Sequence, residues 1–134
     1  MYLIDSSAWI EFLRRTGSPA HLEVRRLVHE QPADVHLTEP VIMELLAGPN
    51  DQRTVHQLEK LVDGLPVLPV DGFLDYRAAA TAARASRGRG HPVRSLVDCL
   101  IAAVAVRTGA ALVHRDRDYD RLAECLADLR IHQF

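Results

Sequence analysis

Short apolar runs alternate with longer amphipathic segments along most of the chain. The runs lie at residues 2–5, 35–37, 65–70, 110–113 and 129–131. Their length and flanking turn residues are those of strands buried in a sheet. Strands that alternate with helices predict an α/β protein, here a three-layer α/β/α fold with a central, mostly parallel sheet. Pro66 and Pro69 weaken the third strand, because proline has no backbone N–H to donate.

Capping residues and glycines indicate where the helices begin and end. Ser6 or Ser7 is the expected cap of a first helix whose apolar face, including Trp9, we assign to the core. Ser18 followed by proline begins the second helix, and Gly109 ends the sixth. We expect the second to seventh helices at about residues 19–30, 38–47, 50–62, 71–87, 95–108 and 118–126.

The helix that follows Ser95 is almost wholly apolar, yet Asp98 interrupts it. An ionised carboxylate is expensive to bury without a partner, so this residue is a candidate for a functional site. A structural alternative is that Ser95 and Asp98 form a capping box, with the carboxylate favoured by the helix dipole. Both roles are compatible.

Glu44 and Asp5 raise the same question in other contexts. Glu44 lies within the apolar segment VIMELLA, where it is either a solvent-facing side chain of an amphipathic helix or a site residue. Asp5 follows the apolar run YLI, where it is either a turn residue or a ligand. Neither position decides between its alternatives alone.

Taken together, the acidic residues predict a metal site. In doubly wound folds the functional site lies at the carboxyl ends of the strands, where Asp5 and Asp116 directly or nearly follow a strand. Glu44 and Asp98 belong to neighbouring helix starts that converge on the same edge. Clustered carboxylates repel one another unless a cation keeps them ionised, and oxygen ligands in this number select Mg²⁺, with Mn²⁺ as a substitute.

Length and composition are those of an ordinary globular chain. The 134 residues suit one domain, residues 1–134, and 48% of them are hydrophobic. No apolar stretch approaches the roughly 18 residues that span a bilayer, so we expect a cytoplasmic protein without a membrane segment. Cys99 and Cys125 lack metal-ligand spacing and are expected to be core thiols.

The net charge of −2 argues against a generic nucleic-acid binder. Its distribution changes that view, because setting aside the acids of the predicted site and Asp118 leaves 13 acidic against 16 basic residues, all but one of the latter arginine. Arginine matches phosphate geometry best. The candidate RNA contacts are Arg87, Arg89, Arg94, Arg115 and Arg117, with Arg84 and His91 nearby; the alternative for those in the loop is a solvated surface.

Several other enzyme classes are disfavoured by missing residues. A phosphoryl-accepting receiver domain needs a lysine near its acids, and Lys60 is the only lysine of the chain. A haloacid-dehalogenase phosphatase would show Asp-x-Asp at the first strand, whereas Asp5 is followed by two serines. The glycine-rich fingerprints of dinucleotide and phosphate loops are absent.

The order and contexts of the acids resemble the PIN-domain family, especially the VapC toxins of bacterial VapBC toxin–antitoxin pairs. The resemblance rests on Asp5-Ser-Ser, Thr38-x-x-Val-x-x-Glu44, Asp98-x-x-Ile-Ala-Ala and the segment GAALVHRDRDY that begins at Gly109. It covers nearly the whole chain. The departures are His114, where threonine, serine or asparagine is common, and Tyr119, where phenylalanine is common.

The resemblance implies a single PIN-like ribonuclease domain that hydrolyses RNA phosphodiesters with Mg²⁺. The catalytic set would be Asp5, Glu44, Asp98 and Asp116, and the metal ligands Asp5, Asp98, Asp116 and Asp118, with Asp118 in direct contact or one shell outward. Ser6 or Ser7 would bind a metal-held water or, as we favour, cap the helix. The substrate class it favours is a structured RNA such as tRNA.

The resemblance also implies partners. VapC toxins are typically homodimers silenced by a VapB-type antitoxin, whose tail lies in a groove between helices and approaches the acidic site. The alternative is a non-catalytic PIN-like module that binds RNA or protein. The presence of all four acids in this chain argues against that alternative, because a module that does not cut has no physical need for them.

Overall fold

Three short parallel strands form the sheet of the computed structural model, which describes residues 1–134. The strands are β1 (Tyr2–Ile4), β2 (Val35–His36) and β3 (Ala111–Val113), in the order β2-β1-β3. Tyr2 is paired with Val35 on one side and with Ala111 on the other. The central strand therefore ends beside the end of β3, and residues that follow these two strands emerge at one edge.

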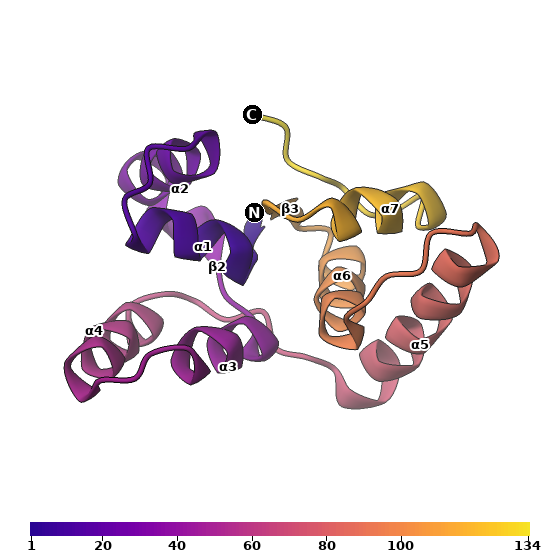
Figure 1. Cartoon of the computed structure of the whole chain (residues 1–134), viewed down its shortest axis with the longest axis horizontal. Coiled ribbons are helices and arrows are strands. Elements are labelled where there is room, and N and C mark those ends of the chain that lie inside the picture. Colours follow the sequence, from indigo (N-terminus) through magenta and orange to yellow (C-terminus); the bar gives the residue numbers. More distant parts are fainter.

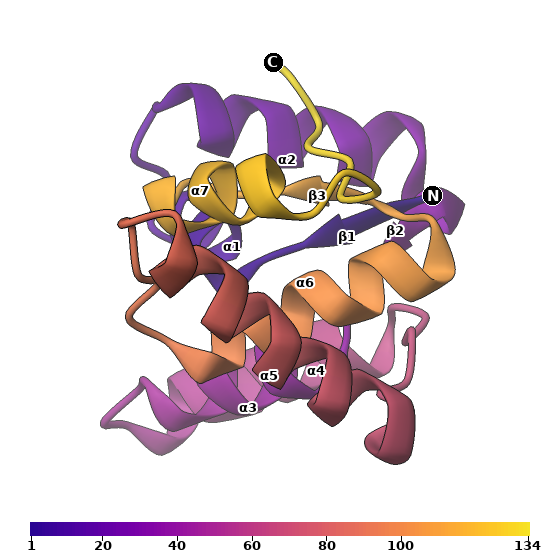
Figure 2. The ribbon, with the colours of Figure 1, turned by 90° about the vertical axis from the view of Figure 1, so that its right-hand side faces the viewer.

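Seven α-helices surround this sheet. They are α1 (Ser6–Leu13), α2 (Pro19–Glu30), α3 (Glu39–Ala47), α4 (Gln52–Asp63), α5 (Gly72–Gly88), α6 (Leu96–Thr108) and α7 (Arg117–Cys125), and a 3-10 turn, η1 (Pro32–Asp34), precedes β2. Helix α2 lies on one side of the sheet and α6, then α5, on the other (Figures 1 and 2). The predicted three-layer α/β/α fold with a parallel sheet is confirmed.

Helix α6 is the central helix of the core. Every residue from Asp98 to Ala105 is buried, which explains why its sequence is apolar all round rather than on one face. Gly109 ends the helix in the left-handed conformation, at φ +73°. None of the helices is long and apolar enough to cross a membrane.

Two of the predicted strands are wrong. Residues 65–70 and 129–131 make only single parallel bridges, Leu37 with Val67 and Leu112 with Ile131. In the first segment, prolines on both sides of the bridge remove N–H donors that a longer ladder needs. After Ile131 the chain turns toward α2, where Nε2 of His132 lies 2.7 Å from a Glu23 carboxylate oxygen.

The cap of α1 also differs from the prediction. Asp5, rather than Ser6 or Ser7, occupies the N-cap position, and its side chain accepts a hydrogen bond from the backbone N–H of Ser7. Aspartate caps α4, α5 and α7 as well. On the apolar face of α1, Trp9 is fully buried, as expected, whereas Leu13 is 42% exposed and lies outside the core.

Candidate active site

Asp5 stands at the carboxyl end of the central strand and is almost fully buried. Its Oδ2 accepts hydrogen bonds from the backbone N–H of Ser7 at 2.9 Å and from the Ser7 hydroxyl at 2.6 Å. Its Oδ1 accepts from the Tyr119 hydroxyl at 2.6 Å. Both oxygens are thus held by donors from the chain, and the carboxylate has a fixed orientation at the edge of the sheet.

Asp98 lies in the first turn of α6, with 8% of its surface exposed. The Ser95 hydroxyl oxygen accepts a hydrogen bond from the Asp98 backbone N–H at 3.3 Å, so the capping interpretation is correct for the backbone. The carboxylate itself faces the other acids, and its Oδ1 lies 3.3 Å from the Tyr119 hydroxyl. Asp98 therefore belongs both to the cap of α6 and to the group of acids.

Asp116 and Asp118 complete a compact group with Asp98. One carboxylate oxygen from each of the three lies within 4.8 Å of the others. Asp116 is the N-cap of α7, and its Oδ1 accepts from the Asp118 backbone N–H at 2.9 Å. Its own N–H donates to Nδ1 of His114 at 3.0 Å. Oxygens this close from three carboxylates suit a small divalent cation.

Glu44 approaches from α3, on the other side of Asp5. Its Oε1 accepts a hydrogen bond from the Ser6 hydroxyl at 3.0 Å, and the residue is half-buried. It is not a solvent-facing side chain, but it lies outside the group of three acids. The serines after Asp5 thus have separate partners, Ser6 holding Glu44 and Ser7 holding Asp5.

Burial and mutual repulsion make it unfavourable for all of these acids to be ionised at once. Burial raises the pKa of Asp98 to about 7, and the negative charges of Asp5, Asp116 and Glu44 add to that rise. Burial also raises the pKa of Glu44, against the opposing hydrogen bond from Ser6. A cation between the carboxylates would remove the repulsion, and the donor set is all oxygen, as Mg²⁺ and Mn²⁺ prefer. The residues therefore fit a divalent metal.

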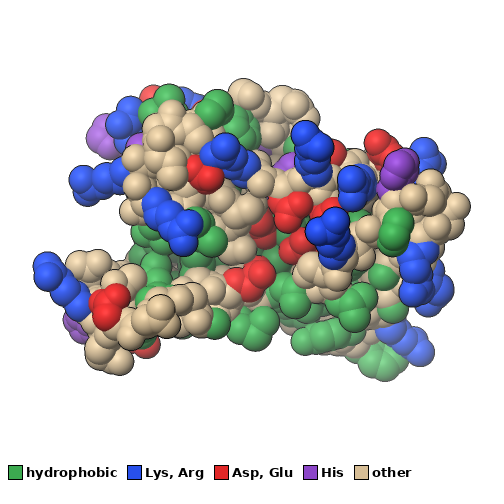
Figure 3. All heavy atoms as spheres, in the orientation of Figure 1, with side chains coloured by type: hydrophobic (Ala, Val, Ile, Leu, Met, Phe, Trp, Pro, Cys, Tyr) green, Lys and Arg blue, Asp and Glu red, His purple; other side chains and the backbone are tan.

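Arginines border the acids in an open pocket of about 510 Å³. Figure 3 shows acidic side chains in a hollow at the centre of one face, with basic side chains around it. Arg115 is paired with Glu11 at 2.6 Å and Arg121 with Asp118 at 3.4 Å. The residues that line the pocket are Arg94, Ser95, Asp98, Arg115, Asp116, Arg117, Asp118 and Arg121.

Only some of the arginines predicted to contact RNA lie at the acidic pocket. Arg94, Arg115 and Arg117 line the acidic pocket, and of these Arg94 and Arg117 make no ion pair. Arg87 and Arg89 are exposed at the end of α5 and do not line it. Sequence reasoning missed Arg121, although its place one turn after Asp118 on a helix is a signal for contact with that acid.

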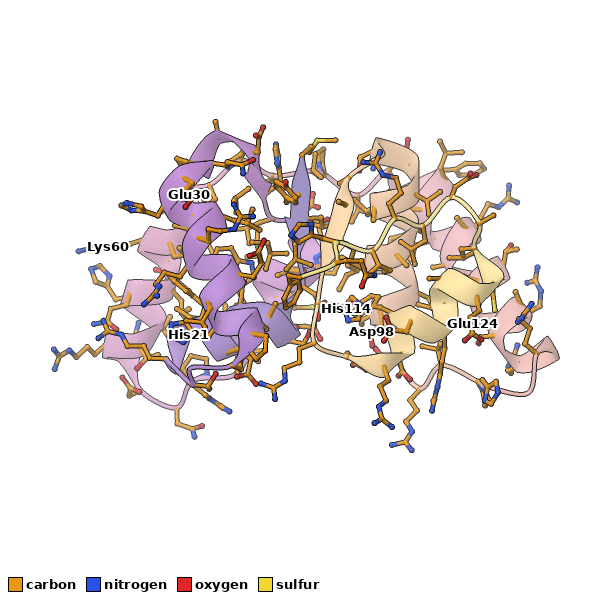
Figure 4. The ribbon with its side chains drawn as sticks, turned by 90° about the horizontal axis from the view of Figure 1, so that it is seen from above. His21, Glu30, Lys60, Asp98, His114 and Glu124 are labelled. Atoms are coloured by element: carbon orange, nitrogen blue, oxygen red, sulfur yellow. The ribbon has the colours of Figure 1, made fainter.

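The exclusion of a receiver domain agrees with the position of the only lysine. Lys60 is exposed on α4, at the outer edge of the molecule, whereas Asp98 and His114 lie near its middle (Figure 4). No lysine lines the acidic pocket. Cys99 and Cys125 are free thiols, and burial beside Asp98 raises the pKa of Cys99 to about 11, so it is no nucleophile.

Comparisons with known proteins indicate the family and the fold of the chain. A family model described as the PIN domain matches residues 2–124. The chain is 54% identical over 123 residues to the ribonuclease VapC11 of Mycobacterium tuberculosis, covering 92% of each chain. FitAcB from Neisseria gonorrhoeae superposes with a TM-score of 0.75 at 20% identity, covering 99% and 97% of the two chains. A toxin–antitoxin complex from Klebsiella pneumoniae gives 0.70 at 14% identity, covering 98% and 100%.

Proposed function

The chain belongs to the PIN-domain family, and on this premise we propose that it is a Mg²⁺-dependent endoribonuclease toxin controlled by an antitoxin. The observation that carries the proposal is the convergence of five acids from four elements (β1, α3, α6 and α7) at one edge of the sheet. Their contacts with Tyr119 and the serines bring Asp5, Glu44 and Asp98 toward Asp116 and Asp118. The identity to a named ribonuclease supports the same activity.

Each acid has a role in this proposal. Asp5, Asp98, Asp116 and Asp118 would hold the metal, with Asp118 contacting it directly or through a water molecule. Bound there, Mg²⁺ would supply positive charge that offsets the charge developing on the scissile phosphate. Glu44 is the candidate base: Ser6 holds its Oε1, which leaves Oε2 to accept a proton from a water, and its raised pKa suits that task.

Phosphate binding would come from the rim of the pocket. Arg94 and Arg117 are exposed and make no ion pair, so their guanidinium groups are available to RNA phosphates. Arg115 would have to leave its ion pair with Glu11 before it could bind a phosphate. We propose a structured RNA as substrate, with tRNA as the first pool to test, and Arg87 and Arg89 as contacts beyond the pocket.

An antitoxin would use a second groove, of about 360 Å³, between α1, α3 and α4. Ile10 and Leu13 expose apolar surface there, and Glu44 lies at the same groove. An amphipathic segment that covers these residues would extend toward the acids. We propose that a VapB-type antitoxin binds in this groove, in keeping with the likeness to a toxin–antitoxin complex.

A second copy of the chain would cover another apolar face. A pocket of about 640 Å³ between α3, α5 and α6 is lined mainly by hydrophobic residues. Met43, Tyr76 and Leu96 on this face are each more than half exposed. Apolar surface of this kind typically marks a protein interface, and we propose that it forms the homodimer contact.

Cleavage of purified tRNA and total RNA by the antitoxin-free protein tests the activity. We expect discrete products with Mg²⁺, none with EDTA, and a loss of at least about a hundredfold for Asp5→Ala or Asp98→Ala. Asp128→Ala, an exposed acid away from the pocket, is the matched control. If folded protein binds RNA but never cuts it, or if the site variants cut as well as the wild type, the non-catalytic module is the correct interpretation.

A further inference from the structure

Tyr119 is a fully buried phenol at the centre of the acidic site. Its hydroxyl lies 2.6 Å from Oδ1 of Asp5 and 3.3 Å from Oδ1 of Asp98. A phenol has one proton to donate, and the shorter contact assigns it to Asp5. Tyr119 therefore joins an acid of the first strand to an acid of α6 from a third element, α7.

A second set of contacts links the other oxygen of Asp5, Oδ2, to the segment that precedes α7. The Ser7 hydroxyl donates to Oδ2 of Asp5 and accepts the backbone N–H of Arg115 at 2.9 Å. The chain then runs through Asp116 to Tyr119, which returns to Oδ1 of Asp5. The segment that carries Asp116 thus holds Asp5 directly at Oδ1, through Tyr119, and indirectly at Oδ2, through Ser7.

The ring of Tyr119 has its own support. The His114 ring lies 5.1 Å from it between centroids. His114 accepts the Asp116 backbone N–H at Nδ1, and its Nε2 lies 3.3 Å from an oxygen of Asp120. His114 and Tyr119 are therefore in contact with each other and with the acids.

We propose that Tyr119 is a positioning residue for the metal site, whose hydroxyl holds the Asp5 carboxylate in the orientation that binds the cation. The inference rests on the proposed function, because it assumes that Asp5 and Asp98 bind a divalent metal. Substituting a residue that hydrogen-bonds to a metal ligand typically lowers metal affinity by about 10- to 100-fold. Loss of the hydroxyl frees Oδ1 of Asp5 and leaves only Ser7 to orient the carboxylate.

Metal binding to Tyr119→Phe tests the proposal without relying on activity. The variant keeps the aromatic ring and removes only the hydroxyl. We expect Mn²⁺ affinity, measured by isothermal titration calorimetry, to fall about tenfold, and the rise in Tm on adding Mn²⁺ to shrink with it. Tyr2→Phe is the matched control, because the Tyr2 hydroxyl makes no hydrogen bond within the chain, and it should bind like the wild type.

The outcomes separate this inference from the proposed function. If the wild type binds no Mn²⁺, or binds it as well with Asp98→Ala, the metal site itself is wrong. If the wild type binds and Tyr119→Phe binds equally well, Tyr119 only fills space and the inference is overturned. Should Tyr119→Phe not fold, Ser7→Ala tests the same clamp from Oδ2 of Asp5, and unchanged Mn²⁺ affinity there would reject the positioning role.

Discussion

Asp98 combines two opposing demands in one side chain. It is 8% exposed among other acids, which raises its pKa to about 7, yet the proposed chemistry needs it ionised. Groups placed under such strain for function lower the stability of the folded chain when their partner is missing. Substitution at this position should therefore move stability and activity in opposite directions.

We expect Asp98→Asn to be inactive and more stable than the wild type in EDTA at pH 8. The amide keeps the shape of the side chain and removes the charge that Asp5, Asp116 and Glu44 repel. The gain in Tm should be about 5 °C by differential scanning calorimetry. Asp128→Asn, on the surface, should change neither quantity, and a lower Tm for Asp98→Asn would contradict this account.

The same residue makes the stability of the metal-free protein depend on pH. Its pKa is about 7 in the folded chain against an ordinary value of 3.8, so the folded state binds this proton more tightly than the unfolded state. The stabilisation is complete below about pH 4 and is lost as the pH rises to about 7. In EDTA, the difference in Tm between Asp98→Asn and the wild type should therefore grow from about pH 4 to about pH 7. If the Tm values of the two proteins change with pH in parallel, Asp98 is not the source of the pH dependence.

At the scale of single residues, the sequence points to a candidate site where a residue contradicts its surroundings. Asp98 in an apolar helix and Asp5 after an apolar strand were unusual enough to be singled out, and the structure brings them within reach of one phenol. Tyr119 gave no such signal, because a tyrosine on the apolar side of a helix is the ordinary content of a core. Its hydrogen bond to a residue 114 positions away depends on tertiary packing.

Helix α6 carries both a site residue and much of the core, so its termination matters for both. Gly109 ends it at φ +73°, a conformation that costs residues with a Cβ about 1–2 kcal/mol. Gly88, at the end of α5, has no such φ, and an added Cβ meets no atom within 4 Å at either glycine. Alanine at either position creates no steric clash, so a comparison of the two substitutions measures the backbone strain at Gly109 alone.

We expect Gly109→Ala to lower the free energy of unfolding by about 1–2 kcal/mol in urea titrations. Gly88→Ala should be neutral or stabilising by up to about 1 kcal/mol, because alanine restricts the unfolded chain without straining this helix. Equal effects of the two substitutions would mean that the left-handed end of α6 has no energetic consequence.

Helices could be predicted more fully than strands, for a physical reason. A helix satisfies its hydrogen bonds locally, so serine caps, prolines and glycines mark its ends, as Ser18 and Gly109 do here. A strand needs a partner that the local sequence does not specify. Residues 65–70 and 129–131 have the composition of strands, but each finds only one bridging position at the rim of a three-stranded sheet.

Across the whole molecule, the face formed by α3, α5 and α6 exposes large apolar side chains, among them Met43, Tyr76 and Leu96. We expect Tyr76→Asp to shift the proposed homodimer toward monomer in size-exclusion chromatography with light scattering, because a charge would be desolvated in the contact. Leu22→Asp, which changes an exposed leucine on α2, should stay dimeric. A wild type that is monomeric at all concentrations, or a Tyr76→Asp dimer, would remove this face from consideration.

The hydrogen bond between Asp5 and Tyr119 joins the end of β1 to α7, and this has a consequence for biosynthesis. Asp5 is made early, and Tyr119, which holds its carboxylate, is made 114 residues later. A nascent chain therefore holds an incomplete set of acids until Asp116 and Asp118 have been made. If the protein cleaves RNA, a nascent chain gains that activity only once the segment with Asp116 and Asp118 has folded beside Asp5.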